Sequence, residues 1–192
     1  QRRIAVGLAE DAGWFDRGVF GLVKVDGKSY PEEARLYQLR FPMHHDASIR
    51  REAARNRLDP AWVAAEIRAE SVFEPKARSP ANARGLMQIL PGTGAEVARK
   101  LGLPWGGAES LYDPETNITL GTAYLRQLLD KYGKPYQTIA AYNAGPAPVG
   151  RWTSQRPAMD PDFWIETISY KETREYVARV LAFSTIYDWR LN

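Results

Sequence analysis

Hydrophobic and polar residues recur with helical spacing along most of the chain, and residues 59–71 show this spacing clearly. Asp59 is a typical N-cap, Pro60 suits the first helical position, and the interior is rich in Ala. At about 100° per residue, Glu70 lies about 20° from Val63 and therefore on the apolar stripe of this helix. The pattern predicts a helix that turns one carboxyl group toward the interior of the domain.

Further segments with the same spacing are separated by Pro and Gly residues. Helices are predicted over residues 4–12, 14–24, 30–39, 46–57, 86–90, 92–101, 114–132, 138–145, 161–167 and 172–189. The segment 114–132 is the longest amphipathic one, and Gly121 on its apolar face is expected to admit the close approach of another helix. The last helix is expected to bury Tyr176, Val177, Val180, Leu181 and Ser184.

No convincing strand pattern accompanies these helices. Residues 72–85 contain two prolines and scattered polar residues, which predicts a loop with at most a minor β-ribbon. The expected fold class is therefore all-α.

Composition narrows the class of protein only mildly. The 192 residues suffice for one domain with a hydrophobic core, alone or with an appendage. The 26 Lys and Arg residues exceed the 23 Asp and Glu residues only slightly and are scattered, which disfavours a nucleic-acid binder. The absence of Cys excludes disulfides and thiolate chemistry. No run of about 18 apolar residues is present, so no integral membrane segment is expected, and no signal peptide is visible.

His44 and His45 are adjacent, and paired His residues are candidates for metal binding. Neighbours in sequence point in different directions on regular structure, so one metal ion would not readily meet both. The pair is interpreted as a polar junction, and no metal site is expected.

Four short motifs occur in order along the chain. They are Glu-Ser at 70–71, Gly-Leu-Met-Gln at 85–88, Ala-Tyr-Asn-Ala-Gly at 141–145 and Glu-Thr-Arg-Glu-Tyr-Val at 172–177. Ser79-Pro80 and the segment 113–118 lie between them. Each motif alone is weak, but together they resemble the soluble lytic transglycosylases, which cleave the peptidoglycan of bacterial cell walls. The resemblance covers about residues 46–188. It implies a lysozyme-like, goose-type-like helical domain with Glu70 as its catalytic acid.

The resemblance implies chemistry with a single carboxyl group. Glu70 would protonate the glycosidic oxygen between N-acetylmuramic acid and N-acetylglucosamine, while the acetamido oxygen of the substrate stabilises the developing cation. The ionised Glu70 would then take the proton of the muramyl C6 hydroxyl, which closes onto C1 and gives a 1,6-anhydro sugar without consuming water. Glu66, towards the edge of the stripe, and Glu74, beyond the helix, are not placed to flank a sugar opposite Glu70. No metal or organic cofactor is implied.

Further substrate-binding residues follow from the resemblance and from side-chain chemistry. Gln88 offers a carboxamide to an acetamido group or a sugar hydroxyl, and Ser79 offers a hydroxyl near the scissile sugar or caps its loop. Tyr142 offers a ring wall for a sugar face and a phenol within reach of Glu70. Asn143 either contacts substrate or caps the turn that follows it.

The last predicted helix adds two residues, because Glu172 and Tyr176 are four apart and share a face. Glu172 would receive an amino group or a hydroxyl of the substrate, and Tyr176 would brace Glu70. The alternatives are a solvated Glu and a core Tyr. Gly85 is expected to let the chain approach the saccharide closely. Three Trp residues are either sugar platforms or core residues: Trp152, Trp164 and Trp189.

The resemblance also predicts how the chain is divided. Residues 1–45 are interpreted as a helical linker, the tail of a larger N-terminal region, and residues 46–192 as the catalytic domain. Peptidoglycan glycan strands are the expected partner, and a periplasmic location is expected from this substrate alone. Two other functions stay open, namely a hydrolytic muramidase and a non-catalytic peptidoglycan-binding module that uses the same groove.

Overall fold

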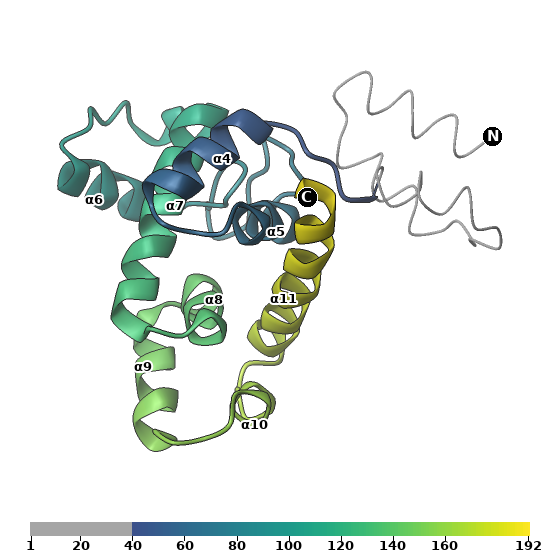
Figure 1. Ribbon diagram of the computed structural model, residues 1–192. Coiled ribbons are helices and arrows are strands. Elements are labelled where there is room, and N and C mark those ends of the chain that lie inside the picture. The colour runs from purple at the N-terminus through teal and green to yellow at the C-terminus, as the bar shows by residue number, and fades with distance from the viewer. Residues whose placement is uncertain (1–39) are drawn as a thin grey trace.

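The computed structural model describes residues 40–192, in which helices are joined by loops (Figure 1). In chain order the elements are α4 (Asp46–Arg55), α5 (Pro60–Glu70), α6 (Pro91–Leu101), the 3-10 helix η1 (Ala108–Tyr112), α7 (Pro114–Tyr132), α8 (Pro135–Ala144), α9 (Pro146–Gln155), α10 (Pro161–Glu166) and α11 (Lys171–Leu191). The helices predicted over residues 4–12, 14–24 and 30–39 lie outside the described residues, as does most of the predicted linker.

Helix α5 runs through the interior of the domain. The side chain of Asp59 accepts a hydrogen bond from the N–H of Ala61 (2.8 Å), and Pro60 occupies the first turn, as predicted. Residues 61–67 are all buried, so neighbouring elements cover this part of the helix on every side and not along one stripe. Its main neighbour is α11, which lies beside it in Figure 1. This burial withdraws water from the carboxyl groups that α5 carries.

Helix α7 is the long amphipathic helix that the pattern predicts. Asp113 caps it by accepting a hydrogen bond from the N–H of Thr116 (2.8 Å), and Gly133 follows its last turn with a φ of 69°. Gly121 does admit a close approach, but the neighbour is the side chain of Met87 from the loop before α6, not another helix. Any Cβ at position 121 would collide with Met87, so this glycine sets how closely the loop packs on α7.

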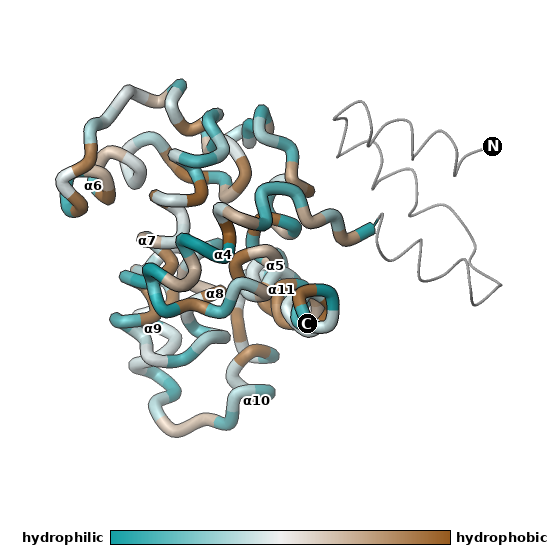
Figure 2. Tube along the Cα trace, turned by 45° about the horizontal axis from the view of Figure 1, so that its top comes forward, coloured by the Kyte–Doolittle hydropathy of each residue, from teal (hydrophilic) through white to brown (hydrophobic). Residues whose placement is uncertain are grey.

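Helix α4 covers one side of α5 and α7. It begins at Asp46 and ends at Arg55, two residues before the predicted end, because Arg57 has a φ of 52° and cannot continue the helix. Figure 2 shows α4 as mostly hydrophilic. Its apolar residues Ile49 and Ala53 are fully buried. A narrow apolar face is therefore enough to seat this helix on the core.

The segment between α5 and α6 differs most from the prediction. Residues 86–90 form turns and an isolated bridge instead of the predicted helix, and Gln88 has a positive φ of 46°. The minor ribbon is reduced to isolated bridges that pair Arg84 with Arg78 and with Ile89. Each N–H of the Arg84–Ile89 pair donates to the carbonyl of the other residue (3.0 Å), and this hairpin-like exchange replaces helical bonding. Elsewhere in residues 40–192 no strand forms.

Helix α9 is an element that the sequence pattern misses. Pro146, Pro148 and Gly150 within five residues indicate a loop. Proline is nevertheless compatible with the first turn of a helix, because the N–H groups of that turn have no intrahelical partner. Val149 and Trp152 anchor this helix, since both are buried.

Helix α11 confirms the predicted last helix, with one correction to its buried face. Tyr176, Val177 and Val180 are buried, whereas Leu181 is 38% exposed and Ser184 is half-buried. Leu181 is exposed because it lies about 90° from the centre of the stripe that faces the domain.

Two of the three Trp residues are core residues. Trp152 and Trp164 are buried, and their ring centroids lie 6.5 Å apart, so both belong to the core near α9 and α10. Trp189 is 65% exposed near the end of α11. The buried pair is therefore not available as a sugar platform.

Candidate active site

Glu70 is the last residue of α5 and lies where α5 meets α11. Its side chain is partly buried, and its Oε1 lies 2.6 Å from the Tyr176 hydroxyl, which hydrogen-bonds to it. Tyr176 itself is 2% exposed. The predicted contact between Tyr176 and Glu70 is present, and Tyr176 is also a core residue, so the two alternatives hold together.

Glu66 lies one turn before Glu70 and is the part of the site that the sequence prediction misplaces. It is expected at the edge of the stripe, but it is fully buried. Trp62 Nε1 donates a hydrogen bond to its Oε1 (3.0 Å), and the Tyr176 hydroxyl bonds to its Oε2. The stripe argument fails here because α5 is buried on every side over this turn. As predicted, Glu66 does not flank a ligand opposite Glu70, since it is closed off from solvent.

Burial controls the protonation of both carboxyl groups. Desolvation raises the pKa of Glu70 from 4.5 to about 7; the Tyr176 hydrogen bond and the Arg179 charge oppose this rise, and Glu172 adds to it. Desolvation also raises the pKa of Glu66, to about 8, against the hydrogen bonds from Tyr176 and Trp62 and with the help of the Glu70 charge. A substantial share of Glu70 is therefore protonated near neutral pH, as a general acid requires.

Helix α8 contributes the Tyr-Asn pair of the third motif. The Tyr142 hydroxyl donates to the carbonyl of Met87 (2.8 Å), so its phenol ties α8 to the loop and not directly to Glu70. Burial raises the pKa of Tyr142 well above 10, and the charges of Glu70 and Glu66 raise it further. Asn143 Oδ1 accepts a hydrogen bond from the Thr173 hydroxyl (2.6 Å), which joins α8 to α11. This contact is structural, but it joins two helices and is not the predicted cap of the following turn.

The loop before α6 holds the other two predicted polar residues. Gln88 Nε2 donates to the carbonyls of Ala77 (3.1 Å) and Gly85 (2.9 Å), so its amino group supports the loop and its Oε1 is the atom left for a ligand. Ser79 Oγ accepts a hydrogen bond from the N–H of Ala83 (3.0 Å), which is the loop-capping alternative, and its hydroxyl proton can still be donated.

Gly85 serves a different purpose from the predicted one. It has a φ of 75°, and any Cβ there would collide with the Leu111 carbonyl and the Asn117 side chain. The close approach that needs glycine is therefore to the protein's own chain, not to a saccharide.

Asn117 is the site-forming residue that the sequence reasoning missed. It is fully buried in α7, accepts a hydrogen bond from the N–H of Met87 (2.7 Å), and donates to the carbonyls of Arg84 (2.9 Å) and Leu111 (2.8 Å). The bonds to Met87 and Arg84 fasten the Gly-Leu-Met-Gln loop to α7, and the bond to Leu111 fastens η1. The available signal was a polar residue four positions before Gly121 on the buried face of an amphipathic helix.

Glu172 is exposed on the first turn of α11, and its charge acts on Glu70. It shares a face with Tyr176, as predicted, but it stands outside the buried part of the site. The structure thus places Tyr176, Glu172 and Tyr142 around the carboxyl of Glu70. Glu66 lies one turn earlier in α5 and bonds to the same Tyr176 hydroxyl.

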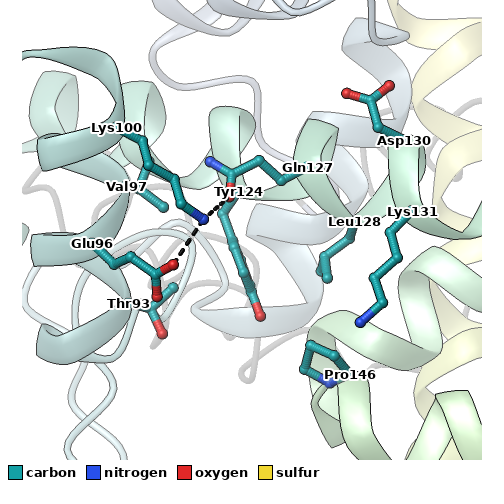
Figure 3. Close-up of a pocket in the computed structure, with 10 residues that line it drawn as sticks. All are labelled: Thr93, Glu96, Val97, Lys100, Tyr124, Gln127, Leu128, Asp130, Lys131 and Pro146. Carbon is teal, nitrogen blue, oxygen red and sulfur yellow. Dashed lines mark hydrogen bonds and ion pairs between the residues drawn. The ribbon is translucent and has the colours of Figure 1, made fainter.

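A groove of about 820 Å³ extends between α6 and α7 toward the start of α9 (Figure 3). On its α6 side Lys100 bonds to Glu96 (2.7 Å) and Gln127 (3.2 Å). Glu70 does not line this groove. Tyr124 connects the groove to the surroundings of Glu70. It lines the groove, and its ring packs on that of Tyr142, with 5.5 Å between the centroids. The groove next to Tyr142 is lined by the aromatic ring of Tyr124 and by polar side chains of α6 and α7.

Within residues 40–192 no three His, Cys, Asp or Glu side chains gather closely enough to hold a metal ion. None of the helices in this part of the chain is both long and apolar enough to cross a membrane. The groups that the site offers are therefore carboxyls, phenols, amides and hydroxyls.

The helical domain with a partly buried carboxyl at the end of α5 has the lysozyme-like fold of the solved lytic transglycosylases described below. The Transglycosylase SLT domain family matches residues 47–165, and the Soluble lytic transglycosylase helical domain matches residues 167–192. The chain belongs to the transglycosylase SLT domain family.

Named relatives agree with this assignment. The soluble lytic murein transglycosylase of Escherichia coli K12 is 36% identical over 153 residues, which are 78% of this chain and 24% of that protein. The putative soluble lytic murein transglycosylase of Haemophilus influenzae is 35% identical over 182 residues, which are 94% of this chain and 30% of that protein. The chain thus spans only about a quarter to a third of the length of these relatives.

Solved structures show the same fold. An inactive Glu-to-Gln mutant of the lytic transglycosylase Slt from Pseudomonas aeruginosa superposes with a TM-score of 0.87 at 37% identity, covering 97% of this chain and 30% of that one. The 70 kDa soluble lytic transglycosylase of Escherichia coli has the same TM-score at 31% identity, with the same shares covered. The all-α, lysozyme-like fold expected from the sequence is therefore confirmed.

Proposed function

We propose that this domain cleaves the β-1,4 bond between N-acetylmuramic acid and N-acetylglucosamine in peptidoglycan without water, as a lytic transglycosylase. The observation that carries the proposal is the state of Glu70, a partly buried carboxyl with a raised pKa that is held by the Tyr176 hydroxyl. Such a group can donate a proton near neutral pH and take one back in the next step.

The reaction proceeds in two proton transfers. Glu70 donates its proton to the glycosidic oxygen, the bond from that oxygen to C1 of the muramyl sugar breaks, and the acetamido oxygen of the same sugar stabilises the cationic carbon. The Glu70 carboxylate then removes the proton of the C6 hydroxyl, whose oxygen forms the new bond to C1. Glu70 ends in its starting state, and the product carries a 1,6-anhydro ring.

The surroundings of Glu70 support this route over hydrolysis. Most glycoside hydrolases use a second carboxyl on the opposite side of the sugar, as a nucleophile or to activate a water molecule. Glu66 is fully buried and cannot reach a sugar. The C6 hydroxyl is part of the reacting sugar itself. Its effective concentration at C1 is therefore large, and no second carboxyl is needed.

Other residues have supporting roles in the proposal. The Tyr142 ring forms a wall for the sugar, Gln88 Oε1 accepts a hydrogen bond from it, and the Ser79 hydroxyl donates to its acetamido oxygen. Glu172 meets an amino or hydroxyl group of the substrate at the solvent side. Asn143 acts through its bond to Thr173, which fixes α8, the helix that carries Tyr142, against α11.

The longer glycan strand has room beyond the site. The groove beside Tyr124 continues from Tyr142, and its aromatic and polar lining suits sugar rings. Named relatives are murein transglycosylases, which is consistent with a peptidoglycan strand as substrate and with a periplasmic location. The division into a linker over residues 1–45 and a catalytic domain over residues 46–192 is part of the same proposal.

Digestion of purified sacculi in water labelled with heavy oxygen tests the function. We expect fragments with 1,6-anhydromuramyl ends, one water lighter than reducing ends, and no heavy oxygen at C1. Heavy oxygen at the new C1 end would show a hydrolytic muramidase. Binding to sacculi without release of fragments would show a non-catalytic module.

A further inference from the structure

A fully buried and a partly buried carboxyl group share one phenol in this site. The Tyr176 hydroxyl contacts Glu70 Oε1 at 2.6 Å and also bonds to Glu66 Oε2. Glu66 is 0% exposed and Tyr176 is 2% exposed, so bulk water does not replace the contact between these two residues. Among residues 40–192, the other bond of the Glu66 carboxyl is to its Oε1, from Trp62 Nε1. The mechanism above does not use Glu66, although it is the most deeply buried acid of α5.

The protons available to this arrangement can be counted. A phenol has one proton to donate, and a carboxylate has none. If both Glu66 and Glu70 are ionised, only one of the two contacts is a hydrogen bond and the other sets two oxygens against each other in a buried site. If one carboxyl is protonated, it donates to the phenol oxygen while the phenol donates to the other carboxylate, and both contacts are satisfied. The geometry therefore fits a pair that holds one carboxyl proton between its two members.

We propose that Glu66 is a positioning residue for the reaction, which shares one proton with Glu70 through the Tyr176 hydroxyl. The inference rests on the proposed function for its catalytic consequence. When Glu70 holds the proton as the acid, Glu66 carries the charge and accepts from the phenol. When Glu70 releases its proton to the glycosidic oxygen, two buried negative charges face one phenol proton. This repulsion favours the return of a proton to Glu70, which is the transfer from the C6 hydroxyl.

The other charged and titratable groups around the pair are few. From α11 the Glu172 and Arg179 charges act on Glu70, and from α8 the Tyr142 phenol interacts with both carboxyls. Helix α4 also packs on α5, and its buried acid Glu52 is engaged by Arg51 (3.0 Å). None of these groups bridges the two carboxyls as Tyr176 does. Burial and the mutual charge raise the pKa of Glu66, which agrees with a shared proton.

The variant Glu66→Gln tests the inference because it keeps the shape of the side chain. The carboxamide oxygen introduced at this position can still accept from Trp62, and the carboxamide nitrogen donates permanently to the Tyr176 oxygen, so the phenol always donates to Glu70. The neighbouring charge is also removed. Both changes favour the Glu70 carboxylate, and we expect its pKa to fall by about one pH unit.

The pKa of Glu70 is measured on the full chain without substrate, by titration of carbon-13-labelled Glu carboxyls followed by NMR, with Glu70→Gln assigning the signal. In the unmodified chain the Glu70 signal should move in two steps shared with Glu66. In Glu66→Gln it should move in one step at lower pH. An unchanged single step in both proteins would overturn the inference. Glu52→Gln, the same change at a buried acid of α4, is the matched control and should leave the titration unchanged.

A second variant separates the phenol bridge from simple charge repulsion. In a Tyr176→Phe background the effect of Glu66→Gln on the Glu70 pKa should shrink to less than half. An equally large effect in that background would show that the phenol does not couple the pair.

The cleavage assay keeps the two proposals apart. The alkaline limb of the rate of anhydromuropeptide release should move to lower pH in Glu66→Gln, by the same amount as the NMR titration. If fragments lack anhydro ends while the titration shifts as expected, the proposed function fails and the shared proton stands. If anhydro ends form while the titration does not change, only the shared proton fails.

Discussion

The site has two walls that are built by different physics. The helical wall, made by α5, α8 and α11, is held by the burial of side chains, and its polar groups Glu66, Glu70 and Tyr176 bond to one another. The loop wall, residues 71–90, is held by hydrogen bonds from side chains to backbone, among which those of Asn117 and Gln88 are central. The helical wall sets the protonation of Glu70, and the loop wall is the part that the proposed function places against the substrate.

This difference shows why the two walls should respond to different changes. Removing a charge or a phenol from the helical wall should change pH profiles more than folding, because the fold there is held by apolar burial. Removing a polar anchor from the loop wall should change folding, because buried backbone groups then lose their partners.

Asn117→Ala should strongly destabilise the loop wall. The N–H of Met87 and the carbonyls of Arg84 and Leu111 would lose their buried partner. We expect the free energy of unfolding to fall by about 2–4 kcal/mol, measured by urea denaturation. Asn192→Ala, at an exposed Asn at the end of the chain, is the control and should have no measurable effect. A loss below about 0.5 kcal/mol for Asn117→Ala would show that the loop is held in some other way.

Tyr176→Phe should slow cleavage and change its pH profile. The Tyr176 hydrogen bond lowers the pKa of Glu70, so its loss should raise that pKa above about 7. A general acid is active below its pKa, and the alkaline limb of the rate should therefore move to higher pH. We expect a rate loss of roughly 10- to 100-fold at the optimum, because Glu70 also loses its brace. A profile that moves to lower pH would contradict the assigned contact.

Glu66→Gln should make stability less dependent on pH. The pKa of Glu66 is about 8 in the folded protein and near 4.5 when the chain is unfolded. Between these values the folded state binds more protons than the unfolded state, so the native chain loses stability as pH rises from about 4.5 to about 8. The carboxamide that replaces the Glu66 carboxyl has no such proton to lose. From pH 5 to pH 9, the free energy of unfolding of the variant should therefore rise relative to that of the native chain by on the order of 1–3 kcal/mol. Parallel stability curves for the two proteins would contradict the raised pKa of Glu66.

Glu172→Gln should have the smallest effect. The Glu172 charge raises the pKa of Glu70, so its removal should lower that pKa. Because Glu172 is exposed, solvent screens this interaction, and we expect a shift of only about 0.2–0.4 pH unit in the alkaline limb. The shift should vanish at high salt. A shift that persists in high salt would indicate a buried contact instead.

The two walls also differ in how far the sequence predicts them. The helical wall follows from local signals, since the Asp59-Pro60 start, the stripe with Glu70 and the spacing of Glu172 and Tyr176 all depend on residues within one or two turns. Even here the full burial of Glu66 is not predicted, because the sequence of a helix does not indicate on how many sides other elements cover it.

The loop wall could not be predicted in the same way. Residues 86–90 contain good helix formers, but the N–H of Met87 bonds to Asn117, 30 residues away in the chain, and Ile89 exchanges backbone hydrogen bonds with Arg84. Gly85 and Gly121 are required by packing partners that only the fold brings near, Leu111 and Asn117 for the first and Met87 for the second. Helix α9 was missed because Pro and Gly in its first turns outweighed its two buried residues in the pattern.

The central claim is that one partly buried carboxyl performs both proton transfers. Glu70→Gln keeps the shape of the side chain and removes its proton, so its effect on intact sacculi tests this claim directly. We expect release of anhydromuropeptides, quantified by mass spectrometry, to fall at least about a thousandfold while the protein still sediments with sacculi. Release within about tenfold of the unmodified chain would show that another group supplies the proton, and the account would be wrong.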